Sequence, residues 1–342
     1  MNRLGSLTGT YAVFSPSNSP QQWLVAGPNV VAFQILNNSN GSVIEYDTTN
    51  AVNGSRALCL PFLEGTVVVG IGAPSYLATA TPGAVNSAAL TALGPNVTQT
   101  TDNPARPVGG AGSAPVVITT KVVPSLKPLN ATTPVQLKYT VFNPAAGVSE
   151  TSVTMKDDGI APDAVAGDTI FTAQIPTTAM TAGQMLRWRV EAKDNASTAA
   201  TNPPYRDTAD NDKYFGTVAL DGITTSSLPI LHWFITDADL TSVEAADNNF
   251  VRTSFFYLGK FYDNVRADRH GQSTAGFPKK SYNFNFNQDN QFKWKQGESN
   301  IGAINLLTSW ADKSKVRNQV AWEAWDDNGH IASHWSQIVR LQ

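Results

Sequence analysis

The chain of 342 residues is 42% hydrophobic and 15% charged, and its formal net charge is −3. It is long enough for two or three domains with buried cores, and its charge, well under the ~25% usual for soluble domains, is typical of extracellular β-rich modules. The single cysteine, Cys59, excludes an intrachain disulfide, and we find no apolar run of the ~18 residues that a membrane span needs. The first residues lack the apolar core of a signal peptide, so we expect an extracellular protein to have lost that signal or to begin inside a longer reading frame.

Charge and tryptophan are unevenly distributed along the chain. Residues 1–250 hold 12 Lys and Arg against 19 Asp and Glu, whereas residues 251–342 hold 12 against 8. The last block also carries five of the eight tryptophans, namely Trp294, Trp310, Trp322, Trp325 and Trp335. We therefore expect a separate C-terminal domain, whose basic surface either binds an anionic ligand or is simply solvated.

The first three segments predict β structure around a linker. Residues 1–87 contain short strand-like runs separated by Asn-Gly turns, which predicts a β-rich domain. Residues 88–114, rich in Pro, Gly, Ala, Ser and Thr, predict a linker. Residues 115–220 contain six short strand patterns with turn signals between them, which predicts an Ig-like antiparallel β-sandwich with Trp188 in its core.

Four aspartates gather between two strands of this predicted sandwich, at Asp157, Asp158, Asp163 and Asp168. Asp-rich loops bind calcium through several oxygens, although this spacing is not that of an EF-hand. Asp and Gly also suit hydrogen-bonded turns for backbone reasons. The sequence leaves both interpretations open, a structural calcium site or a self-stabilised turn.

Residues 228–342 predict an α+β domain with antiparallel strands and one main helix, so the fold class of the whole chain is mainly β with a C-terminal α+β part. The helix is expected over residues 309–329, with Ser309 or Asp312 as its N-cap. Val316 and Val320 recur at a four-residue step and predict its buried stripe. A final strand is expected over residues 336–342.

A cluster of cations stands before an alternating strand, in RHGQSTAGFPKKSYNFNF at 269–286. In a strand, Lys280 shares a face with the aromatic residues that follow it, and Lys279 lies on the opposite, polar face. A lysine at the rim of an apolar face, beside a glycine-containing loop, suits a phosphate, because the loop offers N–H donors and the ammonium a point charge.

Glu323 is a candidate partner for this lysine. It lies three residues after Val320, on or beside the apolar stripe of the predicted helix, and a carboxylate facing a core needs a partner. Protein kinases pair a strand lysine with a helix glutamate to hold the lysine against nucleotide phosphates. The alternative is that Glu323 reaches solvent while Lys280 lies flat over Tyr282.

The order of these motifs resembles the N-terminal part of the CotH kinase family, atypical protein kinases that are secreted or associated with the spore coat. An arginine before Gly-Gln-Ser, the Pro-Lys-Lys-Ser-Tyr strand at 278–282 and the Asp-Lys-Ser…Arg-Asn element at 312–318 carry the resemblance, which spans about 228–342. Upstream, residues 74–86 resemble the end of a lamin-tail-like domain. Residues 157–173 resemble a turn of Ig-like modules, with Thr169 where glycine is usual, so we expect a loop position that tolerates positive φ to have changed.

The resemblance implies ATP-dependent phosphoryl transfer to Ser or Thr of coat or surface proteins, with Mg²⁺ or Mn²⁺, in the cell envelope or outside a bacterial cell. Carried over, Lys280 is the phosphate-binding catalytic lysine and Glu323 its helix partner. Arg269, Gly271 and Ser273 shape the cofactor-binding loop with Lys280. Kinases carry their general base and metal-binding acids after the strand on which this chain ends, so we expect the chain alone to be inactive.

The alternative is a non-catalytic surface protein that binds other cells, the cell wall or a glycan. Exposed aromatic residues such as Trp23 or Tyr205 could stack on sugars in such a protein. Nucleic acid is not an expected partner, because the basic block is small and one phosphate site explains its lysines better. ATP binding that depends on Lys280 separates the two hypotheses.

Overall fold

The computed structural model of the protein describes residues 90–145, 149–220, 226–247, 249–329 and 334–342. The chain divides into two compact units, 1–91 and 92–342, and nearly all described residues belong to the second. The predicted β-rich, lamin-tail-like domain at 1–87, with Trp23 and Cys59, lies outside the described residues. The described part is mainly β, as the sequence predicts.

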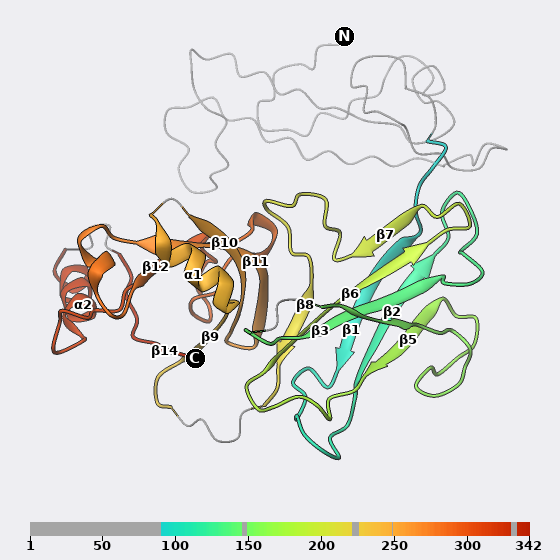
Figure 1. The fold of residues 1–342 in the computed structure, drawn as a ribbon, viewed down its shortest axis with the longest axis horizontal. Coiled ribbons are helices and arrows are strands. Elements are labelled where there is room, and N and C mark those ends of the chain that lie inside the picture. Colours follow the sequence, from blue (N-terminus) through green and yellow to red (C-terminus); the bar gives the residue numbers. More distant parts are fainter. Residues whose placement is uncertain (1–89, 146–148, 221–225, 248, 330–333) are drawn as a thin grey trace, which may run out of the picture. The chain divides into compact units, whose positions relative to one another are not determined.

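The first half of the described unit is a β-sandwich (Figure 1). One sheet has the order β1-β2-β5, and the other has the order β4-β3-β6-β7 with β8 also pairing with β6. The strands are β1 (Asn96–Asn103), β2 (Val116–Val123), β3 (Val135–Val141), β4 (Thr151–Thr154), β5 (Ile170–Ile175), β6 (Met185–Lys193), β7 (Ala199–Asn202) and β8 (Phe215–Val218). Alternate residues of β2 and β6 are buried between the sheets, and Trp188 lies in this core as expected.

The prediction of a linker over residues 88–114 is wrong for its middle part. Asn96–Asn103 forms β1, which pairs antiparallel with β2 along Val116–Val123. The segment alternates weakly because most of its residues are polar and only partly buried, and a bulge between Thr98 and Thr101 interrupts its register. An edge strand of this kind carries little of the hydrophobic alternation by which strands are recognised.

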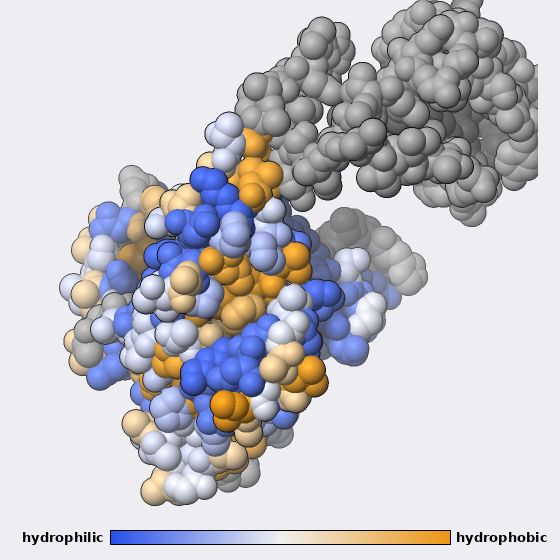
Figure 2. All heavy atoms as spheres, turned by 90° about the vertical axis from the view of Figure 1, so that its right-hand side faces the viewer, coloured by the Kyte–Doolittle hydropathy of each residue, from blue (hydrophilic) through white to orange (hydrophobic). Residues whose placement is uncertain are grey.

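The surface of the sandwich is mixed. Figure 2 shows the face at the right of Figure 1, where hydrophilic groups lie between small hydrophobic areas. Exposed aliphatic side chains of the sandwich include Val108, Ile160 and Val165. Scattered exposed apolar residues are normal on a folded domain and define no binding surface by themselves.

The turn before β5 uses its aspartates to satisfy the backbone. Asp157 accepts hydrogen bonds from the backbone N–H groups of Gly167 and Thr169, at 2.6 and 3.0 Å. Asp163 accepts from the N–H of Gly159 at 2.6 Å. The carboxylates therefore act as local turn acceptors, which is the second of the two interpretations of this sequence.

The structure does not bring the four aspartates together around a common cavity for calcium. Asp158 accepts from the N–H of Ile160, and the ammonium of Lys156 lies 3.5 Å from its carboxylate. Asp168 accepts from the N–H of Ile170. Among the described residues, no group of three or more His, Cys, Asp or Glu side chains is arranged to hold a metal ion. The residues present do not fit the calcium site that the Asp-rich pattern allowed.

The second half of the unit is a six-stranded sheet with the order β13-β12-β11-β10-β9-β14. Its strands are β9 (Ile230–Phe234), β10 (Phe250–Tyr257), β11 (Lys260–His270), β12 (Ser281–Asn285), β13 (Ala303–Leu306) and β14 (Arg340–Leu341), the last pairing parallel with β9. Helix α1 (Asp237–Ala245) packs Val243 and Leu240 against the aromatic core of this sheet. Short 3₁₀ turns are η2 (Ser273–Gly276) and η3 (Gln288–Asn290).

The main helix of the last block is shorter than expected, and a second helix was missed. Helix α2 spans Arg317–Gly329 and does not begin at residue 309, because Lys315 has φ 63°, outside the helical region. Asp312 caps this preceding turn through the N–H groups of Ser314 and Arg317. Helix α1 was not predicted, because its few apolar residues form only a weak one-sided pattern.

The sandwich covers the face of the second sheet opposite α1. The ring of Phe142 packs edge-on against Phe234 at 5.7 Å, and the guanidinium of Arg106 lies 5.1 Å from the ring centre of Phe256. A Cβ on Gly216 of β8 would stand 2.5 Å from the ring of Phe261, so only glycine allows this close approach.

A buried carboxylate fixes this contact. Asp263 of β11 is 2% exposed and accepts from the hydroxyl of Ser254 at 2.7 Å. Its other oxygen accepts from the backbone N–H groups of Lys213 and Tyr214, just before β8, and the guanidinium of Arg187 lies 3.4 Å away. A buried charge is tolerated because each oxygen has a partner.

A second carboxylate joins the loop before β8 to the sheet. Asp212 accepts from the amides of Asn287 and Asn290, at 2.6 and 2.5 Å. Burial, together with the neighbouring charges of Asp263 and Asp289, raises the pKa of Asp212 to about 7 despite the two amide hydrogen bonds, which lower it. The proton therefore binds this carboxylate more tightly in the folded than in the unfolded chain.

This pKa predicts that the protein gains stability as the pH falls from 8 towards 5. The folded state takes up a proton at Asp212 in this range, whereas the unfolded chain does so only near the ordinary pKa of 3.8. Chemical denaturation should show the free energy of unfolding rising by roughly 1 kcal/mol per pH unit through this group. Asp212→Asn should lose that part of the pH dependence. The exposed control Asp327→Asn should keep it, and equal profiles for Asp212→Asn and wild type would contradict the assignment.

Thr169 supports a second prediction. Its φ is 71°, so the backbone here keeps the positive φ of the usual glycine, and the change expected from the substitution has not occurred. A β-branched residue is strained there and glycine is not, so Thr169→Gly should raise the free energy of unfolding by about 1 kcal/mol. Thr151→Gly, on the exposed strand β4, should lower it. A lower thermal midpoint for Thr169→Gly than for wild type would show that the threonine is not strained.

Candidate functional site

The candidate site is the loop that joins β11 to β12. The two strands pair up to its base, where His270 stands opposite Ser281 and Arg269 opposite Tyr282. Gly271 begins the loop with φ 84°, a conformation that favours glycine. Ser273 begins η2 inside the loop. Gly271, Ser273 and Lys280 thus belong to one short loop closed by a paired stem.

Lys280 points into this loop. Its ammonium donates hydrogen bonds to the carbonyl oxygens of Ala275 and Phe277, at 2.5 and 2.9 Å. The side chain is half-buried, whereas Lys279 is exposed and contributes its backbone carbonyl to the hydroxyl of Thr308. The two lysines therefore occupy different environments, although both precede β12, which begins at Ser281.

The strand after Lys280 has the expected aromatic face. Tyr282, Phe284 and Phe286 are buried in the core that α1 covers. The ring of Trp233, from β9, lies 4.7 Å from that of Tyr282 and 5.2 Å from that of Phe284. These packed rings fix the start of β12, and with it the backbone from which Lys280 extends.

The predicted pair of Lys280 and Glu323 is not formed in this structure. Glu323 is exposed on α2 and accepts a hydrogen bond from the amide of Gln319 at 2.7 Å. The prediction assumed that the apolar stripe of the helix faces a core, but Val320 and Trp325 are 56% and 54% exposed. Glu323 lies beside an uncovered stripe and therefore needs no buried partner.

Arg269 also differs from its expected place. Its guanidinium donates to the backbone carbonyl of Glu244 at 2.7 Å and, through Nε, to the carboxylate of Asp247 at 3.0 Å. Both acceptors lie at the C-terminal end of α1 or directly after it. The arginine thus contacts the helix end and not the interior of the loop.

A polar chain beside the loop was missed in the sequence. The amide of Asn283 donates to Asp268 at 2.9 Å, and its oxygen lies 2.6 Å from Nδ1 of His270. The amide oxygen can only accept, so Nδ1 of His270 is the donor of this hydrogen bond. The polar alternation of β12 was the signal for it, since Asn283 lies on the face opposite the aromatic rings.

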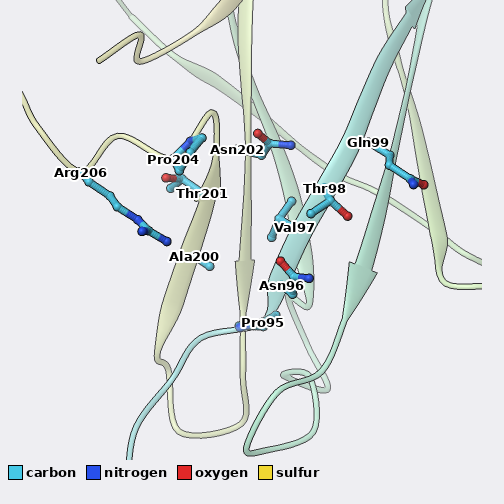
Figure 3. A pocket seen from close by; sticks show the side chains of 10 residues that line it. All are labelled: Pro95, Asn96, Val97, Thr98, Gln99, Ala200, Thr201, Asn202, Pro204 and Arg206. Carbon is cyan, nitrogen blue, oxygen red and sulfur yellow. The ribbon is translucent and has the colours of Figure 1, made fainter. Parts of the chain in front are cut away.

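A cavity of about 400 Å³ lies elsewhere, between the edge strands β1 and β7 of the sandwich. Figure 3 shows Asn96 and Thr98 of β1 on one side and Thr201 and Asn202 of β7 on the other, with Arg206 at the rim. Its lining contains none of the predicted kinase-site residues. Tyr205, named as a candidate stacking residue, is half-buried, and its hydroxyl lies 3.3 Å from the carbonyl of Thr208.

No described helix has both the length and the apolar character required to cross a membrane.

Comparison with known proteins gives one match that bears on function. Residues 267–339, about a fifth of the chain, match the family described as CotH kinase protein. A comparison with curated proteins gave no match. Among solved structures, the crystal structure of Spo0M, a sporulation control protein from Bacillus subtilis, aligns over 70% of this chain and 100% of its own, at 8% identity and a TM-score of 0.20, too low to support any argument. The segment with the β11–β12 loop, Lys280 and helix α2 is therefore CotH kinase-like in sequence.

Proposed function

We propose that this segment is the nucleotide-binding part of a CotH-type phosphotransferase, and that Lys280 binds the phosphates of ATP in the presence of Mg²⁺ or Mn²⁺. The observation that supports this most is the ammonium of Lys280, directed into a glycine-initiated loop at the start of a packed strand. A lysine ammonium supplies the point charge with which proteins commonly bind phosphate groups.

The chemistry at Lys280 would be an exchange of acceptors. Without ligand, the ammonium is satisfied by the carbonyl oxygens of Ala275 and Phe277. A phosphate oxygen carries full negative charge and makes a stronger, charge-assisted bond with the same ammonium than a neutral carbonyl does. The divalent ion would neutralise the remaining phosphate charge.

The resemblance to CotH kinases also suggests what the complete reaction would be. The terminal phosphoryl group of ATP would pass to a Ser or Thr hydroxyl of a coat or surface protein, outside the cell or in its envelope. Positioning and charge neutralisation supply most of the catalysis in such reactions. Lys280 would orient the phosphates for in-line transfer. Glu323, which matches the family's helix, would join Lys280 only through a movement of α2.

Equilibrium binding of ATP tests this assignment. Lys280→Met removes the charge and keeps the length of the side chain. We expect the dissociation constant for ATP with Mg²⁺ or Mn²⁺ to rise roughly 10- to 100-fold, because losing one hydrogen bond to a charged group has an effect of this size. Lys279→Met removes an exposed lysine one residue away and should leave binding within about twofold. Equal losses in the two variants, or no ATP binding by the wild-type chain, would contradict the proposal.

Glycan binding is the second candidate, and the cavity between β1 and β7 is the observation that favours it. Its lining is rich in amide and hydroxyl side chains, with Arg206 at the rim, and these groups can hydrogen-bond to sugar hydroxyls. Binding to a glycan array that is weakened by Arg206→Ala and unaffected by Lys280→Met would support this function. A chain that binds ATP but shows no signal on the array would exclude it.

A further inference from the structure

The side chain of Arg269 is the first of two groups that hold the C-terminal end of α1. It is only 12% exposed in the ion pair with Asp247, and Nη2 bonds to the same carboxylate oxygen as Nε. Nη1 binds the carbonyl of Glu244, which lies in the last turn of the helix. The last carbonyls of a helix lack intrahelical partners and attract cations, so the guanidinium caps α1 from outside.

Tyr282 is the second group, and it holds the same residue from the next strand. Its hydroxyl donates to the carboxylate of Glu244 at 2.5 Å, while its ring is packed against Trp233. Burial raises the pKa of Tyr282, and the hydrogen bond and charge of Glu244 raise it further. The phenol therefore remains a donor at any ordinary pH.

The two groups stand directly opposite each other across the stem of the candidate loop. Arg269 of β11 pairs with Tyr282 of β12, and the next pair, His270 and Ser281, closes the loop. Glu244 is thus bound through its backbone by the strand that enters the loop and through its side chain by the strand that leaves it. Lys280 is two residues from Tyr282 along the chain.

We propose that Glu244, Arg269 and Tyr282 form a positioning cluster that fastens the end of α1 to both strands of the stem, and thereby fixes the loop from which Lys280 meets a phosphate. Arg269 then acts on the ligand through the loop and not by touching it. The inference rests on the proposed function only for the identity of the ligand. The cluster orders the loop whether or not a nucleotide is bound.

A purely structural role would predict something different. Loss of these contacts would then lower global stability and leave the loop as ordered as the rest of the sheet. A positioning role predicts local opening of residues 271–280, because their stem loses its support from α1 while the aromatic core stays packed. Hydrogen exchange separates the two, since it reports opening segment by segment.

The test compares two variants with matched controls in the full chain. Tyr282→Phe removes one hydroxyl and keeps the packed ring. Its control is Tyr257→Phe, in the same core, whose hydroxyl lies 3.4 Å from Gln337. Arg269→Gln removes the cap of α1, and its control is Arg266→Gln, an exposed arginine of the same strand.

We expect amide exchange in peptides covering 271–280 to become roughly tenfold faster in Tyr282→Phe and in Arg269→Gln. Each variant loses hydrogen bonding to a charged group, and the loss of one such bond has an effect of this size. Exchange in β6 of the sandwich should be unchanged, and both controls should match wild type. The dissociation constant for ATP with Mg²⁺ should rise several-fold in the two variants. Unchanged loop exchange with a lower melting temperature would overturn the proposal, as would faster loop exchange with unaltered ATP binding. If the wild-type chain binds no ATP, the proposed function fails, and the exchange data alone decide whether the cluster orders the loop.

Discussion

The buried carboxylate of Asp263 is the constraint on which the described unit depends. It lies on β11 of the second sheet, yet two of its hydrogen bonds come from backbone N–H groups before β8 of the sandwich. An ionised group buried this deeply is costly unless every acceptor is satisfied. The sheet can therefore keep Asp263 in place only while the sandwich supplies those donors. The sandwich is therefore packed against the sheet that carries the CotH-like segment, and is not joined to that sheet by the chain alone.

Strand β11 connects Asp263 to the candidate site. Asp263 fixes the middle of the strand against the sandwich, and Arg269 near its end binds α1 on the other face. The strand is held on both faces before it enters the loop of Lys280. A loop that starts from a strand supported in this way is more precisely placed than a loop between unsupported elements.

Much of this architecture follows from local patterns in the sequence. The period of two placed Tyr282, Phe284 and Phe286 on one face, because strand geometry alone decides these positions. Trp188 was found in the sandwich core for the same reason. The positive φ at Thr169 was not expected, because threonine at the usual glycine position suggested that the backbone there had changed.

The rest depended on contacts that carry no local pattern. Arg187 and Asp263 are separated by 76 residues, and the sequence around either residue does not indicate that the two are in contact. Glu323 was expected beside a buried core, because the apolar stripe of the helix does not by itself show whether another element packs against it. The Asp-rich turn allowed two interpretations, since carboxylates that bind calcium and carboxylates that bind backbone N–H groups follow the same composition.

The two carbonyls that hold Lys280 have a consequence for affinity. Because Ala275 and Phe277 already occupy the ammonium, a ligand gains only the difference between its own contacts and those it displaces. The loop carbonyls therefore compete with any anionic ligand for the ammonium of Lys280, and this competition weakens the binding of weakly charged ligands most. The hydrogen bonds of the unliganded loop would thus already favour a polyphosphate over other anions, before any residue that contacts the rest of the nucleotide contributes to specificity.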